Sequence, residues 1–219
     1  MSNLLITPSL LNSFDFAVSA PPSWKVKAYR SLVSQIKREP FDPSPEIQRG
    51  IEFENKVYDE CRYLSDPDYV NDTSKQQYSP HFETVVKRCL HGDFQTVVKD
   101  KWTIDNDTFV LYGKIDVDLP KKIIDIKTTG NYKGPKQYLK TWQHIMYTLL
   151  TNKKFFEYVV VEWADKHSGD IKDVHTVKYE VEDFNELKKN LINQIYKLMG
   201  YLHSHKLYED YFYTFSNNK

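Results

Sequence analysis

One stretch, residues 112–129 with the sequence YGKIDVDLPKKIIDIKTT, constrains the fold and chemistry of this chain more than any other. Its two apolar runs are separated by residues 118–121 (DLPK), which predicts two adjacent β-strands joined by a tight turn. Side chains alternate faces along a strand, so Asp125 and Lys127 point the same way. The first run ends in a further acid, Asp116. Charged groups are costly to place on apolar strands, and such a cost is usually tolerated only where the groups have a function. The stretch therefore predicts a functional site.

The composition is that of an ordinary globular chain. Of the 219 residues, 27% are charged and 40% hydrophobic, and the formal net charge is zero, so any basic surface must be local. No apolar run approaches the roughly 20 residues needed to span a bilayer, and the N-terminal residues lack the pattern of a signal peptide. We therefore expect a single domain, residues 1–219, with no membrane partner.

The two cysteines, Cys61 and Cys89, exclude several kinds of site. They are too few for a disulfide framework, a four-cysteine zinc site or a four-cysteine iron–sulfur cluster. We therefore expect no iron–sulfur cluster, and a reducing, cytoplasmic setting.

The first part of the chain, about residues 1–65, has the pattern of three helices. Thr7 and Ser44 each precede a proline and are candidate N-caps, and residues 24–37 form an amphipathic pattern between these two starts. The residues expected to be buried are Leu10, Leu11 and Phe14 in the first helix, Val26, Tyr29, Val33 and Ile36 in the second, and Ile47, Ile51, Val57, Tyr58 and Cys61 in the third.

The remaining residues predict a mixed central β-sheet flanked by helices, an α/β or α+β fold. After a loop at 65–80, the expected elements are a short helix at 82–90, a hairpin of strands at 94–104 and 108–116, a strand at 121–128, a helix at 135–150, strands at 155–163 and 174–181, and a C-terminal helix at about 183–206. The strand at 155–163 is expected to be buried on both faces. In the helix at 135–150 the candidate core residues are Leu139, Trp142, Ile145, Met146 and Leu149.

The charged residues of the strand pair, with one acid from an earlier helix, form a candidate metal site. Asp116, Asp125, Glu54 and the backbone carbonyl of Ile126 are hard oxygen ligands, which suit Mg²⁺ or Mn²⁺ and not zinc. A metal ion contributes to each requirement of phosphodiester hydrolysis. Lys127 would orient or deprotonate the attacking water and offset charge on the phosphate.

Three further residues support this reading. Gln143 and Tyr147 are four apart and share one face of the next helix, and Gly50 shares a face with Glu54. A glycine inside a helix costs up to about 1 kcal/mol, and close approach of another backbone would explain it. Each of these residues alone is commonly structural, but the whole set in this order and spacing indicates a functional site much more specifically than any single member does.

The segments GKIDVD, IIDIKTT and QHIMY resemble the PD-(D/E)xK nuclease superfamily, and their spacing resembles its RecB-like branch. The residues that match this pattern are Gly113, Asp116, Asp125, Lys127, Gln143 and Tyr147. Upstream, RGIEFE resembles the first-helix motif, with Glu54 at the acid position as in the phage lambda-exonuclease-like branch. The opening ITPSLLNSF resembles the first helix of these nucleases, and the similarity covers roughly residues 4–163.

The resemblance implies a restriction-endonuclease-like core and a metal-dependent DNA nuclease, an exonuclease acting on duplex ends in recombination, repair or phage replication. The implied catalytic residues are Glu54, Asp116, Asp125, Lys127, Gln143 and Tyr147. A structure-specific or restriction-like endonuclease, or a non-catalytic DNA-binding protein with the same fold, are the alternatives. The implied partners are DNA, as duplex ends or single strands, and a recombination or single-strand-annealing protein. Whether the chain forms a homo-oligomer is left open.

A local basic region accompanies the candidate site. Residues 121–154 contain eight lysines against one aspartate, a local net charge of +7, which favours a phosphate-bearing substrate. Tyr132 and Tyr138 in this region could stack on unpaired bases, although most tyrosines are core or rim residues. The candidate DNA-binding residues are Arg49, Thr128, Lys133, Lys136 and Lys140.

Overall fold

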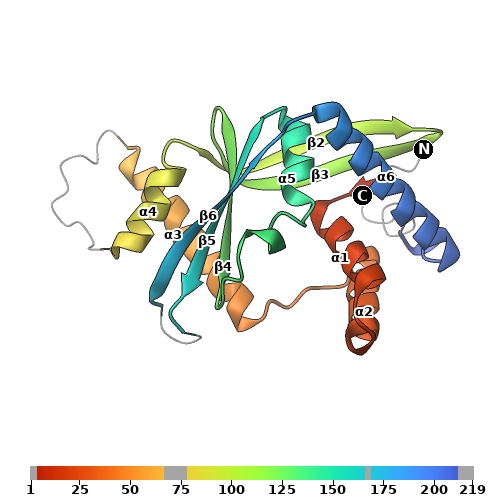
Figure 1. Cartoon of the computed structure of the whole chain (residues 1–219), viewed down its shortest axis with the longest axis horizontal. Helices are drawn as coiled ribbons and strands as arrows, with labels where there is room; N and C mark the ends of the chain where they lie inside the picture. Colours follow the sequence, from red (N-terminus) through yellow and green to blue (C-terminus); the bar gives the residue numbers. More distant parts are fainter. Residues whose placement is uncertain (1–3, 67–77, 166–168, 212–219) are drawn as a thin grey trace.

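A mixed β-sheet organises the computed structural model, which describes residues 4–66, 78–165 and 169–211 (Figure 1). In this part of the chain the strands are β1 (Leu4–Ile6), β2 (Asp93–Ile104), β3 (Asp107–Asp118), β4 (Lys122–Thr129), β5 (Phe155–Trp163) and β6 (Ile171–Glu180). Their order is β1-β3-β4-β5-β6, with β2 paired to β3. The pairs β1–β3 and β4–β5 are parallel and the others antiparallel, which confirms the predicted mixed sheet.

Helices cover both faces of the sheet. They are α1 (Pro8–Ser19), α2 (Lys25–Lys37), α3 (Pro45–Leu64), α4 (Pro80–Cys89), α5 (Gln143–Thr151) and α6 (Phe184–Ser204), with short 3₁₀ turns η1 (Pro22–Trp24) and η3 (Pro135–Gln137). The side chains of Thr7 and Ser44 accept hydrogen bonds from the first turns of α1 and α3, as predicted. Most of the predicted loop at 65–80, residues 67–77, lies outside the described residues. None of the described helices is long and apolar enough to cross a membrane.

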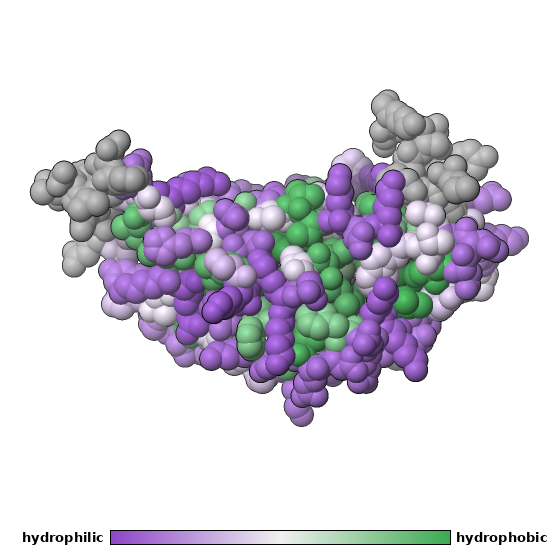
Figure 2. Space-filling model, turned by 90° about the horizontal axis from the view of Figure 1, so that it is seen from above, coloured by the Kyte–Doolittle hydropathy of each residue, from purple (hydrophilic) through white to green (hydrophobic). Residues whose placement is uncertain are grey.

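The sheet separates two hydrophobic cores. The α5-side core joins the sheet to α1, α2, α5 and α6 and includes Leu11, Leu32, Ile115, Met146, Tyr158 and Leu198. The α3-side core joins it to α3 and α4 and includes Phe53, Val57, Val86, Val117, Ile126 and Val159. Alternate residues of β5 enter the two cores, which confirms that this strand is buried on both faces. Hydrophilic residues surround an apolar central area on the face seen in Figure 2.

One edge of β3 is shared between two strands, and this leaves a gap. β1 pairs with residues 109–111 of β3, whereas β4 pairs only with Val117 and Asp118. The stretch of β3 between these pairings faces α5 instead of a strand. Of the predicted site residues, Gly113 and Asp116 lie on this stretch.

The predicted buried faces of α2 and α3 are partly wrong. In α2 the buried residues are Ala28, Leu32 and Ile36, whereas Val26 is 63% exposed and Tyr29 is 37% exposed. Ala28, Leu32 and Ile36 share one helical face, which is the buried face of α2. In α3 the predicted Ile47 and Ile51 are exposed, and the residues actually buried are Gly50, Phe53, Val57, Tyr58 and Cys61.

The predicted helix at 135–150 is two separate pieces. Residues 135–137 form the turn η3, and α5 begins only at Gln143. Leu139, between them, is 38% exposed and not a core residue, while Met146 is fully buried and Trp142 is packed against the core. The backbone N–H of Trp142 donates to Oδ1 of Asn12 in α1 at 2.9 Å, so a side chain from another helix helps fix where α5 starts.

Candidate active site

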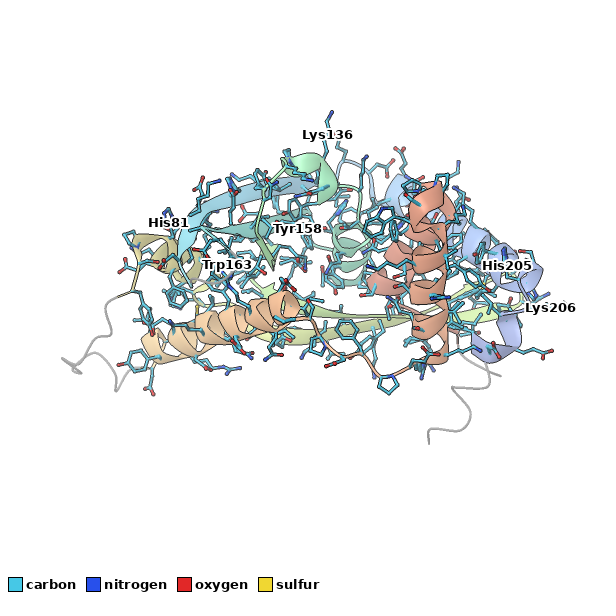
Figure 3. The ribbon with its side chains drawn as sticks, turned by 90° about the horizontal axis from the view of Figure 1, so that it is seen from below. His81, Lys136, Tyr158, Trp163, His205 and Lys206 are labelled. Carbon is cyan, nitrogen blue, oxygen red and sulfur yellow. The ribbon has the colours of Figure 1, made fainter. Side chains whose placement is uncertain are left out.

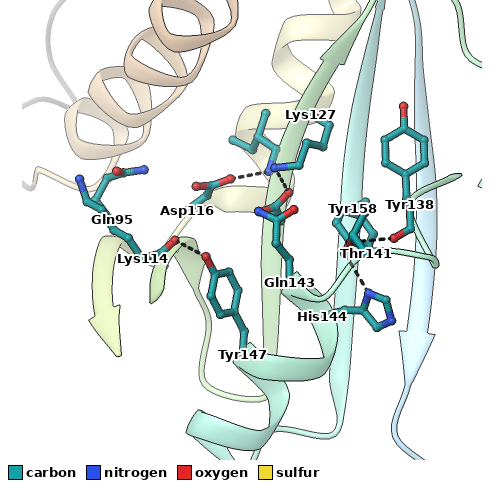
Figure 4. Close-up of polar contacts among 12 residues, drawn as sticks. Gln95, Lys114, Asp116, Lys127, Tyr138, Thr141, Gln143, His144, Tyr147 and Tyr158 are labelled. Carbon is teal, nitrogen blue, oxygen red and sulfur yellow. Dashed lines mark hydrogen bonds and ion pairs between the residues drawn. The ribbon is translucent and has the colours of Figure 1, made fainter. Parts of the chain in front are cut away.

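The two predicted aspartates meet where β3 and β4 separate. The pairing of these strands stops at Val117 and Ile124, so Asp116 and Asp125 occupy the next opposed positions. Oδ2 of Asp116 accepts a hydrogen bond from the backbone N–H of Ile126 at 2.9 Å (Figure 4). A carboxylate thus replaces the partner that this N–H would find in a continued ladder. Because a strand residue directs its N–H and C=O to the same edge, the Ile126 carbonyl also faces the gap.

Asp125 is the most buried group of the site, at 1% exposure. Its Oδ1 accepts a hydrogen bond from Nε2 of Gln143 at 3.0 Å. Its Oδ2 lies 2.5 Å from the Lys127 ammonium nitrogen but has no aligned hydrogen-bond donor among the described residues. The structure therefore brings together Asp116, Asp125, Lys127 and Gln143, all predicted from the sequence.

Tyr147 supports the edge of β3. Its hydroxyl donates to the backbone carbonyl of Lys114 at 3.0 Å (Figure 4). A Cβ atom at Gly113 would lie 2.2 Å from Cε1 of the Tyr147 ring, so this position accepts only glycine without rearrangement. Tyr147 thus contacts the strand that carries Asp116.

Glu54 reaches the site from α3, on the other side of the sheet. Its charge is coupled to Lys127 and Asp125, and its carboxylate interacts with the Tyr58 hydroxyl. The predicted close approach at Gly50 involves a side chain and not a backbone: a Cβ there would lie 2.9 Å from Oγ1 of Thr128 in β4. The absence of a side chain at Gly50 therefore lets α3 lie close to Thr128.

Burial raises the pKa of both aspartates. For Asp116, burial acts first and the charge of Asp125 second. For Asp125, burial raises the pKa and the neighbouring Lys127 offsets part of that rise. Burial disfavours the charged form of Lys127, but Asp125 and Asp116 outweigh it and raise the Lys127 pKa. Lys127 is accordingly an ammonium cation at neutral pH.

Burial also raises the pKa of Glu54 to about 7, against the opposing effect of Lys127. Nearby, burial lowers the pKa of His144 to about 4. His144 is 2% exposed and its Nδ1 lies 2.9 Å from the Tyr158 hydroxyl, which makes it a structural residue of the core (Figure 4).

The donor set of the gap fits a hard divalent cation. Two carboxylates with raised pKa values, one with an oxygen that lacks an aligned donor, face a backbone carbonyl. Mg²⁺ commonly takes one or two protein carboxylates and keeps several waters. Among the described residues no group of three His, Cys, Asp or Glu side chains is placed to hold a metal, so Glu54 does not join both aspartates as a direct third ligand here.

The predicted basic surface is smaller than the sequence suggested. Lys122, Lys127, Lys153 and Lys154 form ion pairs with carboxylates. The predicted DNA-binding residues Lys133, Lys136 and Lys140 are exposed, and Lys136 extends away from the body of the protein (Figure 3). Three of the five predicted DNA-binding residues are thus placed on the surface.

Arg49 and the two candidate stacking tyrosines are engaged within the protein. The Arg49 guanidinium lies over the Trp163 ring, 3.8 Å from its centroid, and Nη1 donates to the carbonyl of Asp165 at 3.1 Å. Tyr132 stacks on His175 with ring centroids 3.8 Å apart, and Tyr138 is buried. In this conformation both tyrosines are occupied by internal contacts.

Sequence reasoning missed two residues beside the site. Tyr58 was predicted only as a core residue, although it lies four positions after Glu54 on the same helix face, a signal that was available. Gln95 in β2 donates from Nε2 to the Tyr58 hydroxyl at 2.8 Å. Nothing in its sequence context indicates this role, because the contact spans 37 residues.

No family model and no curated protein matches the chain. Solved structures that align include LHK-Exo, an alkaline exonuclease from Laribacter hongkongensis, at 15% identity and a TM-score of 0.49, over 92% of this chain and 91% of that one. LHK-Exo in complex with dAMP aligns at 16% identity and 0.47, over the same shares. A phage-related exonuclease from Haemophilus somnus 129PT aligns at 15% identity and 0.47, over 88% and 90%.

Proposed function

We propose that this chain is a metal-dependent DNA nuclease that hydrolyses phosphodiester bonds, acting as an exonuclease on the ends of duplex DNA. The observation that carries the proposal is the meeting of Asp116 and Asp125 in the gap between β3 and β4, with the Lys127 ammonium 2.5 Å from Asp125. Costly buried charges gathered at one point of an apolar sheet are typical of a reaction centre.

Asp116, Asp125 and the Ile126 carbonyl would hold Mg²⁺ or Mn²⁺, with Glu54 beside them. When bound, such an ion neutralises charge on a phosphate and lowers the pKa of a water. Burial raises the pKa of all three carboxyl groups, and that of Glu54 to about 7, so Glu54 is partly protonated at neutral pH in the metal-free protein. The site is therefore expected to release protons when a cation binds.

Lys127 would stabilise negative charge on the attacked phosphate. Its pKa is raised by Asp125 and Asp116 despite burial, so it carries a positive charge and is poorly suited to take a proton from water. This narrows the sequence-based expectation, in which Lys127 could either orient or deprotonate the water. Gln143 would keep Asp125 in place through its hydrogen bond of 3.0 Å.

The exposed lysines at positions 133, 136 and 140 would contact the DNA backbone, and their contribution to affinity should fall as salt rises. The sequence resemblance adds a recombination or single-strand-annealing protein as a partner to the proposal and leaves self-association open. The presence of only two cysteines adds a cytoplasmic setting.

A cleavage assay tests the proposal. Linear and covalently closed circular duplex DNA are incubated with wild type, Lys127→Ala and Lys189→Ala, each with Mg²⁺ or EDTA; Lys189 is an exposed lysine of α6 and serves as the control. Progressive loss of linear DNA alone, dependent on metal and Lys127, supports the exonuclease. Metal-dependent nicking of the circular DNA would show that the protein is an endonuclease and not an exonuclease. Binding without cleavage of either DNA overturns the nuclease.

A further inference from the structure

Gln95 has a backbone conformation that is rare inside a strand. Its φ is 56°, in the left-handed region, although it lies within β2. The other described non-glycine residues with positive φ lie at helix ends or in turns: Arg38, His91, Asp105, Asn152 and Lys206. Such conformations cost free energy and persist where the surrounding structure imposes them, often at functional sites.

This strained residue lies opposite one of the site aspartates. In the antiparallel pairing of β2 with β3, Phe94 pairs with Val117 and Thr96 with Ile115. Gln95 therefore falls opposite Asp116. The irregular position of β2 and the end of the β3–β4 pairing thus coincide along the sheet.

Near Gln95 and Asp116, strands β2 and β3 each pass from contact with one hydrophobic core to contact with the other. Ile115 belongs to the α5-side core and Val117 to the α3-side core, although residues two apart on a regular strand share a face. On β2, Phe94 packs against the α3-side core and Val98 against the α5-side core, although they are four apart. The core that each strand contacts therefore changes close to Gln95 on β2 and at Asp116 on β3.

The side chain of Gln95 reaches a second group of the site. Nε2 donates to the Tyr58 hydroxyl at 2.8 Å, and Tyr58 is buried. Because the hydroxyl accepts this bond, its hydrogen is free to point elsewhere, and the Tyr58 hydroxyl is close enough to Glu54 to lower the pKa of that carboxyl group. Gln95 thus lies opposite Asp116 across the two strands and is linked to Glu54 through Tyr58.

We propose that Gln95 is a positioning residue for the site. Its left-handed backbone turns β3 so that Asp116 faces Ile126 and Asp125, and its amide orients Tyr58 toward Glu54. The catalytic consequence rests on the proposed nuclease function, but the positioning itself can be measured without cleavage.

Hydrogen exchange of the Ile126 amide, measured in the metal-free protein, reports the position of Asp116. Valine resists the left-handed region and asparagine tolerates it, so Gln95→Val should speed this exchange at least about fivefold, the equivalent of one lost hydrogen bond, while Gln95→Asn should not. The control His91→Val introduces the same misfit at a turn, where φ is 68°. The buried Val159 amide is the internal reference, and Gln95→Ala replaces the valine variant if that does not fold.

Unchanged Ile126 exchange in a folded Gln95→Val protein, or equal acceleration in His91→Val, overturns the proposal. In the cleavage assay, Gln95→Val should lower kcat about 100-fold with KM nearly unchanged, because small displacements of reacting groups are costly. Gln95→Asn should restore most of kcat, and its failure to do so overturns the backbone role. If wild type does not cleave DNA, the nuclease proposal fails while the exchange experiment still decides the role of Gln95.

Discussion

The ring of Tyr147 fills the space that a side chain at Gly113 would occupy, since a Cβ atom there would lie 2.2 Å from Cε1. Gly113→Ala should therefore displace the ring and break the hydrogen bond from its hydroxyl to the Lys114 carbonyl. Overpacking of this kind costs about 1–3 kcal/mol, so the free energy of unfolding in urea should fall by that amount.

Gly200→Ala is the matched control. Gly200 lies in α6, and no atom is within 4 Å of a Cβ placed there. Alanine favours a helix over glycine by up to about 1 kcal/mol, so this variant should be as stable as wild type or more stable. Equal losses in both variants would show that the contact with Tyr147 is unimportant.

Removal of the Gln143 amide should destabilise the buried carboxylate of Asp125. Gln143→Leu leaves Oδ1 without its donor at 3.0 Å, which is expected to cost about 1–3 kcal/mol of unfolding free energy. Cleavage should fall as well, because Asp125 loses its fixed orientation. Gln48→Ala removes only an exposed bond to Glu52 and should cost less than about 0.5 kcal/mol. A stable, fully active Gln143→Leu protein would contradict this role.

Glu54 should make the metal-free protein less stable as the pH rises. Burial raises its pKa from 4.5 to about 7, so the folded state holds a proton that the unfolded state releases between these values. Stability therefore falls from about pH 5 to pH 8. Glu54→Gln removes this loss and should exceed wild type by about 2 kcal/mol at pH 8, a figure reduced for partial solvent screening, and by little near pH 4.5.

Urea denaturation in EDTA at pH 5 and pH 8 measures this effect. Glu52→Gln, an exposed neighbour on α3, is the control and should follow wild type. The same pH dependence in wild type and Glu54→Gln would disprove the assignment.

Divalent cations should stabilise the folded protein through the two aspartates. A ligand that binds only the folded state at about 100 times its Kd adds about 2.7 kcal/mol, so Mn²⁺ should raise Tm in wild type. Asp116→Asn should abolish the rise, whereas Asp59→Asn, an exposed position on α3, should retain it. A Tm increase that survives Asp116→Asn would place the cation elsewhere.

Local patterns were sufficient to predict the strand pair and the residues along it. Asp125 and Lys127 share a face because strand periodicity alone decides it, and the caps at Thr7 and Ser44 need only neighbouring residues. Sequence patterns failed to predict burial and helix boundaries that depend on contacts between residues far apart in the sequence. Ala28 is fully buried although alanine is only weakly apolar, and the backbone at the start of α5 is hydrogen-bonded by Asn12 in α1.

Two features had no local signal at all. β1 is only three residues long, which is too short to show the alternation of apolar and polar residues typical of a strand. It is a strand because it pairs with β3. The left-handed backbone of Gln95 could not be predicted from the residue type, since glutamine has no preference for that conformation.

The pairing of β1 with β3 sets an order for folding. Leu4 lies beside Phe109, 105 residues later, and Leu4 and Ile6 are almost fully buried. A contact of such long range costs loop-closure entropy and forms late. During synthesis the earliest strand must therefore wait until the β2–β3 hairpin has emerged, and its exposed apolar side chains are open to wrong partners until then.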